Sequence, residues 1–329
     1  MKKKLLPLAI AAAMAPGFAV AGADVSGFAN ITYNIADDAN QPLTGTNPNE
    51  GKFSAAGELD FITSPADGVT VRLDVDLANG ADNTTTTSLE QAFFAWNAAD
   101  GVTIIGGVFN NPIGMESQND RPDLWGNNRG VIGNILDNQT ARYDNNLTGL
   151  AVTGDLGPVT LTGAVLNDLQ QVNEENSLAL VANYSPVAGL DLELGMVTQA
   201  DTPTHLAQST GLTTAEDIID FNVSYAIPNV AGLTVALDYL SAGKIIDSAY
   251  EIKVDYNYGP WGAGIRTEKV SWSDNTADSD RNTFHASYQV ASNLKAVLEF
   301  ADGDNANPNT AITGIQADNL TTLDLVATF

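Results

Sequence analysis

Acidic side chains are the most abundant charged groups in this sequence. The 329 residues include 40 Asp and Glu against 14 Lys and Arg, which gives a net charge of −26. A protein with this charge repels the phosphates of DNA and RNA, so we expect no nucleic-acid partner. Cysteine is absent and only two histidines occur. This composition excludes disulfides, a zinc ribbon and a histidine-based metal cluster.

Two short acidic stretches could bind calcium through oxygen ligands. They are Asp278-Ser279-Asp280 and Asp302-Gly303-Asp304-Asn305. Neither has the full spacing and closing glutamate of a calcium-binding loop. Solvated acidic loops are the favoured interpretation, and loose binding of divalent cations stays open. We expect no cofactor and no specific metal site.

One pair of side chains could act as base and nucleophile. His285 and Ser287 are two residues apart in an alternating stretch, so they share a strand face. Phe284, Ala286 and Tyr288 occupy the opposite, apolar face. A pair that cleaves lipid should point toward the apolar, lipid-facing side, whereas His285 and Ser287 point toward the polar side. We therefore interpret them as ordinary polar side chains and expect that the protein is not an enzyme.

The elements that position these residues are strands. Tyr250, Ile252, Val254, Tyr256 and Tyr258 alternate with polar and charged residues, and similar stretches recur along the chain. No comparable stretch of helical period appears. Sixteen strands are predicted, at 23–37, 51–65, 68–80, 88–100, 101–110, 139–156, 158–168, 176–187, 189–200, 215–228, 232–243, 248–259, 260–273, 280–293, 294–304 and 319–329.

The connections between these strands are sorted by length. Turns after even-numbered strands are short, such as Gly259-Pro260, whereas those after odd-numbered strands are usually long and polar, such as 110–138. This sorting indicates an antiparallel meander whose two rims differ, which is typical of a membrane barrel and not of a soluble sandwich. The sequence therefore predicts an all-β fold, a 16-stranded antiparallel transmembrane β-barrel.

The first residues have the pattern of an export signal. Lys2, Lys3 and Lys4 precede an apolar run from Leu5 to Ala15, and small residues follow at Ala19-Val20-Ala21 and Ala21-Gly22-Ala23. This pattern predicts a signal peptide at 1–23, cleaved after Ala21 or Ala23, and a barrel domain at 24–329.

Alternation also predicts which charges face inward. Charged groups toward lipid would each cost about 2 to 4 kcal/mol near the bilayer centre, so the apolar residue of each pair is placed outside. The predicted acidic lining consists of Glu58, Asp60, Asp74, Asp76, Glu251, Asp255, Glu268 and Glu299. Few basic residues oppose it, among them Arg72, Lys253 and Arg266. Such a lumen would attract cations.

Aromatic residues lie next to the short turns, where a membrane-interface girdle is expected. They are Phe61, Trp96, Tyr184, Tyr225, Tyr258, Trp261 and Tyr288. The last strand alternates through Leu323, Leu325 and Ala327 and ends at Phe329. The leader, the sixteen strands, the sorted connections and this last strand are features of one family. In these features the chain resembles the Gram-negative general porins.

The resemblance implies a bacterial outer-membrane location, among lipids and lipopolysaccharide, and a homotrimer. It implies that the segment 320–329, with Phe329 at its end, is the signal for the barrel-assembly machinery. It also implies that the third extracellular loop folds inward to narrow the pore. That loop is 110–138, the longest in the sequence.

At the constriction we expect Glu116, Asp120 and Asp123 from this loop to face Arg72 and Arg266 on the wall. Opposed charges would set a transverse field across the opening. Arg121 and Arg129 lie in the same loop and could instead pair with its acids.

The function expected from these observations is passive diffusion of small hydrophilic solutes and ions through a water-filled, cation-preferring porin. One alternative is a substrate-specific channel, with a binding site in the long loop. Another is a plugged barrel with a structural or adhesive task.

Overall fold

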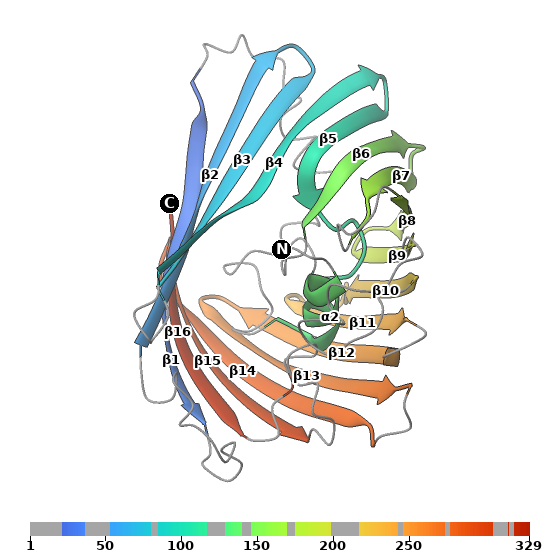
Figure 1. The fold of residues 1–329 in the computed structure, drawn as a ribbon. Coiled ribbons are helices and arrows are strands. Elements are labelled where there is room, and N and C mark those ends of the chain that lie inside the picture. Colours follow the sequence, from blue (N-terminus) through green and yellow to red (C-terminus); the bar gives the residue numbers. More distant parts are fainter. Residues whose placement is uncertain are drawn as a thin grey trace.

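The computed structural model describes residues 22–36, 53–79, 85–116, 129–139, 146–169, 175–198, 217–242, 246–273, 277–304, 315 and 319–329. These ranges form sixteen strands and the helix α2, Val131–Gln139 (Figure 1). The strands are β1 Asp24–Ala36, β2 Phe53–Ala66, β3 Val69–Asn79, β4 Thr85–Ala99, β5 Val102–Asn110, β6 Asn146–Asp155, β7 Val159–Asn167, β8 Asn176–Val187, β9 Leu190–Val197, β10 Ile218–Ala226, β11 Leu233–Ser241, β12 Ile246–Tyr258, β13 Trp261–Trp272, β14 Ser279–Ala291, β15 Leu294–Asp304 and β16 Leu320–Thr328.

The strands form one closed antiparallel barrel. Each strand pairs with its sequence neighbours, and β1 pairs with β16 to close the ring. The amide of Phe329 donates to the carbonyl of Gly27 at 3.1 Å, and the amide of Gly27 donates to the carbonyl of Phe329 at 3.3 Å. Closure leaves no unpaired sheet edge, as a barrel in lipid requires. The predicted fold class is confirmed.

The predicted strand limits agree closely with the structure, except at the start of β6. We expected this strand from residue 139, whereas it begins at Asn146. Residues 131–138, which were expected in the long loop, form a short helix with Gln139, although the sequence has no stretch of helical period comparable to the strand alternation. The apolar side chains of Val131, Ile132, Ile135 and Leu136 are buried together on one side of α2.

Inward and outward faces differ along the strands as alternation predicts. In β8, Leu178 and Leu180 are exposed on the outside, while Ser177, Ala179 and Val181 are buried on the inside. Inward residues are apolar in this part of the wall because the loop after β5 packs against them. Among the described residues, no helix is long and apolar enough to cross a bilayer.

Several aromatic residues project outward near the short turns. Trp96, Tyr184, Tyr258, Trp261 and Tyr288 are all exposed. The rings of Trp261 and Tyr288 are in contact, with centroids 4.4 Å apart. Residues 1–21, which contain nearly all of the expected leader, lie outside the described residues, and Ala23 directly precedes β1.

Candidate functional site

The loop after β5 turns into the barrel and lies against its inner wall. Figure 1 shows α2 inside the ring of strands, and this helix contacts β11, β12 and β13. The amide of Gly114 donates to Glu193 Oε1 at 3.1 Å, and the amide of Met115 donates to Asp238 Oδ2 at 2.8 Å. Glu193 lies on β9 and Asp238 on β11, so the wall carboxylates bind the loop backbone directly.

Two glycines allow this close packing. A Cβ atom at Gly195 on β9 would lie 2.2 Å from Ile113 Cγ2 in the loop. A Cβ atom at Gly130, just before α2, would lie 2.1 Å from Glu251 Oε2 on β12. A larger residue at Gly195 would displace Ile113, and one at Gly130 would displace either the loop or the carboxylate of Glu251.

A buried ion cluster lies between the loop and strands β12–β14. Glu116 Oε1 is 2.5 Å from Lys253 Nζ and 3.4 Å from Arg266 Nη1. Lys253 also pairs with Glu251 at 3.1 Å. Arg266 Nε lies 3.2 Å from Glu268 Oε2, and Arg281 Nε lies 2.5 Å from the same oxygen. The cluster therefore contains three basic and three acidic side chains, and their formal charges balance.

Glu116 stays ionised in these surroundings. Burial alone would raise the pKa of Glu116, but the Lys253 ammonium, the Arg266 guanidinium and the amide of Gly130 outweigh burial and lower the pKa to about 2. The amide of Gly130 donates to Glu116 Oε2 at 2.6 Å. Each oxygen of the carboxylate thus has a defined partner.

Strands β2–β4 carry a different charge pattern, which we call the acidic wall. It consists of Glu58, Asp60, Asp74, Asp76 and Glu90, with Arg72 among them. Arg72 Nε lies 2.6 Å from Asp74 Oδ2, and Arg72 Nη2 lies 3.5 Å from Asp60 Oδ1. The acidic wall contains five carboxylates and one arginine, so its formal charge is −4.

The register of β2 and β3 explains this excess. Glu58 lies directly opposite Asp76, and Asp60 lies opposite Asp74, so two successive inward rows are both acidic. Like charges directly opposite each other destabilise a sheet. On β12 and β13, an acidic row of Glu251 and Glu268 lies next to a basic row of Lys253 and Arg266.

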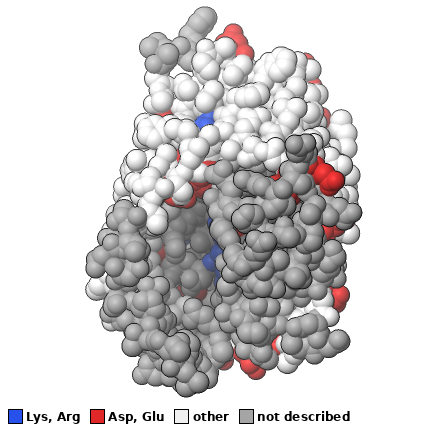
Figure 2. Space-filling model, viewed as in Figure 1, with Lys and Arg blue, Asp and Glu red and all other residues white. Residues whose placement is uncertain are grey.

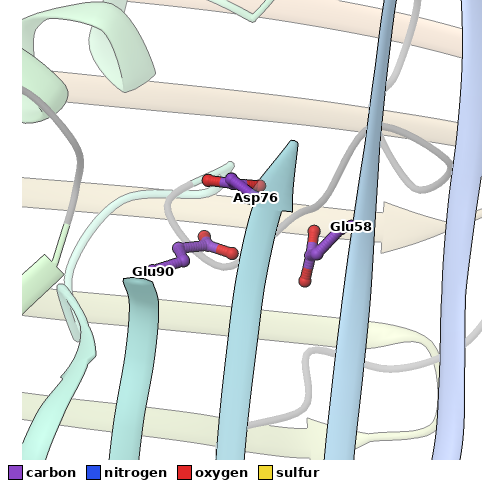
Figure 3. Close-up of side chains that lie close together, drawn as sticks. All are labelled: Glu58, Asp76 and Glu90. Atoms are coloured by element: carbon purple, nitrogen blue, oxygen red, sulfur yellow. The ribbon is translucent and has the colours of Figure 1, made fainter. Parts of the chain in front are cut away.

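Glu58, Asp76 and Glu90 point toward one another from three strands (Figure 3). One carboxylate oxygen of each lies within 4.8 Å of those of the other two. Carboxylates at this spacing could share one divalent cation. They could also attract hydrated cations in transit, which requires only a high density of negative charge and no coordination geometry.

Glu90 was not among the predicted lining residues. The pairing of β3 with β4 shifts between Asp74 and Val75, where Gln91 and Leu89 are the partners, and Glu90 is the extra residue of the bulge. A bulge re-aims side chains and breaks alternation. The signal in the sequence is a change of parity, because the outward apolar residue before the bulge is Leu89, at an odd position, whereas those after it are Phe94 and Trp96, at even positions. The structure exposes Phe94 and packs Phe93 against the interior core.

The structure brings together only part of the predicted constriction. Glu116 and Arg266 are in direct contact and almost fully buried, so these two charges are joined rather than set across an opening. Arg72 pairs with acids on β2 and β3. Asp120 and Asp123 lie outside the described residues. Lys253 was predicted to face the lumen but not to take part in the constriction, and Arg281 was not predicted at all.

The remaining lining residues face the interior at other heights. Asp255 Oδ1 lies 3.1 Å from His285 Nε2, and Glu299 is buried opposite His285 in the register of β14 and β15. Figure 2 shows a hollow in the molecule where both basic and acidic side chains are visible. The described interior is thus polar and charged on several strands, which suits contact with water and ions.

The sequence profile of the Gram-negative porins matches residues 8–318. No curated protein matches the chain.

Solved structures share the fold. A substituted form of the Rhodopseudomonas blastica porin is similar with a TM-score of 0.61 and 16% identity, over 94% of this chain and 100% of that one. Salmonella typhi OmpF in complex with daunomycin is similar with a TM-score of 0.68 and 12% identity, over 93% and 97%. This chain belongs to the Gram-negative porin family, and it is a passive channel protein of the outer membrane rather than an enzyme.

Proposed function

We propose that this porin is a water-filled channel for small hydrophilic solutes and ions, and that it prefers cations. The observation that carries the preference is the acidic wall, which contains five carboxylates and one basic residue, Arg72. Dense negative charge in a pore concentrates cations and raises the barrier to anions. The cluster at Glu116 adds no net charge, so it does not offset this field.

The constriction is formed by the inward loop and the wall that faces it. Glu116 contacts Arg266 of the wall strand β13. Asp120 and Asp123 lie outside the described residues, and we propose only that they add acidic charge to the constriction. The remaining lining acids, Asp255, Glu251, Glu268 and Glu299, continue the polar interior along β12–β15. Two observations support a constriction between the loop and the wall. Glu116 of the loop contacts the wall, and Arg72 points inward from β3.

A matched pair of variants tests the cation preference. Asp76→Asn removes one charge from the acidic wall, whereas Asp278→Asn removes one from an exposed position before β14, where Asp278 pairs with Lys269. We expect Asp76→Asn to reduce the reversal potential measured in a salt gradient across a planar bilayer, and Asp278→Asn to leave it close to that of the wild type. Equal effects of the two variants would contradict the assignment.

The family supports three further proposals about assembly. The leader is removed after Ala21 or Ala23, which leaves a chain that begins at or just before β1. Barrel-assembly machinery recognises the last strand and Phe329, whose backbone closes the barrel against Gly27. The assembled protein is a homotrimer among outer-membrane lipids and lipopolysaccharide, and its exposed apolar face suits that setting.

A further inference from the structure

One carboxylate connects two points of the inward loop with two strands of the wall. Glu116 ends the described stretch that follows β5, and Gly130 directly precedes α2. Glu116 Oε2 accepts the amide of Gly130 at 2.6 Å, while Oε1 faces Lys253 on β12 and Arg266 on β13. The two limbs of the loop are therefore joined to each other and to the wall at the same side chain.

The start of α2 is held by the same cluster. The first amides of a helix have no partner within the helix. Here the amide of Val131 donates to Glu268 Oε1 at 2.7 Å, and Arg281 Nη2 donates to the carbonyl of Arg129 at 3.2 Å. Carboxylates near a helix N-terminus are also favoured by the helix dipole. Every ion pair of the cluster thus lies next to the point where the loop returns to the wall.

The burial of Glu116 shows that it does not meet passing ions. Only 2% of its side chain is exposed, and Arg266 and Glu268 are fully buried. Each charged group of the cluster has a partner of opposite charge, so the long-range electric field of the cluster is small. These features suit a fastening between two parts of the protein and not a charge that selects ions.

We propose that Glu116 is a positioning residue that clasps the inward loop to β12 and β13 and so fixes the bore of the pore. Ion selectivity is left to the acidic wall. This inference rests on the proposed channel function and assigns Glu116 a different task from the one expected from its position in the loop.

A charge-neutral double variant separates positioning from selectivity. Glu116→Gln with Lys253→Met removes one negative and one positive charge, so the net charge of the interior is unchanged. Asp278→Asn with Lys269→Met is the matched control, because it removes an exposed opposite-charge pair that lies 2.7 Å apart and belongs neither to the cluster nor to the acidic wall. Each protein is reconstituted into planar bilayers as full-length folded barrels, with wild type alongside.

We expect the Glu116→Gln/Lys253→Met channel to lose the single fixed conductance level of the wild type and to move between several levels, with an unchanged reversal potential. The control pair should keep one level. A double variant with a single wild-type level would overturn the proposal, and so would a shifted reversal potential in that variant. Wild-type protein that gives no ion-permeable steps would instead overturn the proposed function.

A second measurement does not need the double variant to fold. In Glu116→Gln alone, the amide of Gly130 loses its charged acceptor, and we expect its hydrogen exchange to be roughly tenfold faster than in wild type. The amide of Met115, which is bound to Asp238, is the internal control and should be unchanged. Equal exchange at Gly130 in both proteins would contradict the clasp.

Discussion

Arg72 and Arg266 both face the interior, yet their surroundings give them different tasks. Arg266 is fully buried between Glu116 and Glu268, whereas the side chain of Arg72 is 21% exposed beside Asp60 and Asp74. Removal of one partner from a buried ion network leaves an uncompensated charge, which costs far more than loss of a partly exposed pair.

We expect Arg266→Met to lower the free energy of unfolding by about 3 to 5 kcal/mol. Arg72→Met should cost less, because Asp74 keeps its bond to Gln91 at 2.7 Å, but it should increase the cation preference. Urea unfolding in detergent and reversal potentials in a salt gradient measure the two effects. The same loss of stability in both variants would contradict this division.

Acid should weaken the clasp only at low pH. The pKa of Glu116 is about 2 in the folded protein, below its ordinary value of 4.5, because Lys253, Arg266 and the Gly130 amide favour the ionised form over the effect of burial. A depressed pKa gives a stabilisation that is complete above the unfolded-state value and is lost as the pH falls through the folded-state value.

The difference in thermal midpoint between wild type and Glu116→Gln should therefore be constant above about pH 5 and shrink between about pH 4.5 and 2. Comparison of the two proteins removes the effect of the many other carboxylates, since these titrate in both. A difference that disappears near neutral pH would show that Glu116 is not held by the two cations.

Single residues were predictable from the sequence where alternation is regular. The positions of Glu58, Asp76, Glu251 and Glu268 on inward faces follow from a period of two. Glu90 could not be placed in this way, because the bulge in β4 breaks the period. Ion pairs across the interior, such as Lys253 with Glu116, depend on how the loop folds back, and no local pattern encodes that contact.

The inward loop is an element whose path depends on small residues. Gly130 lets α2 begin directly over the carboxylate of Glu251, and Gly195 accepts Ile113. The apolar residues of α2 are Val131, Ile132, Ile135 and Leu136. Their helical pattern spans too few residues to predict a helix by itself. The long alternating strands were predictable because their pattern repeats over about ten residues on both faces.

Gly130→Ala tests the closeness of loop and wall without a change of charge. The new methyl group would lie 2.1 Å from Glu251 Oε2, so the loop or the carboxylate must move. We expect a lower thermal midpoint and an altered single-channel conductance. Gly154→Ala on β6 is the control, because a Cβ atom there has nothing within 4 Å. A channel unchanged by Gly130→Ala would mean that the loop is not packed as described.

At the scale of the whole molecule, closure and charge work together. The closed ring satisfies every strand edge through the pairing of β1 with β16, which permits an apolar exterior. A protein with a net charge of −26 can then place many carboxylates inside, away from lipid. The strand number and the closure were predictable from the sequence, because few folds other than a closed barrel combine an even number of strands with short connections on one rim and long connections on the other.

The most direct test of the account is the zero-current potential of the wild-type channel across a planar bilayer with a salt gradient. We predict discrete ion-permeable steps and a potential whose sign corresponds to cations crossing more readily than anions. A zero-current potential of the opposite sign would contradict the role of the acidic wall. A bilayer that shows no conductance steps would contradict an open pore.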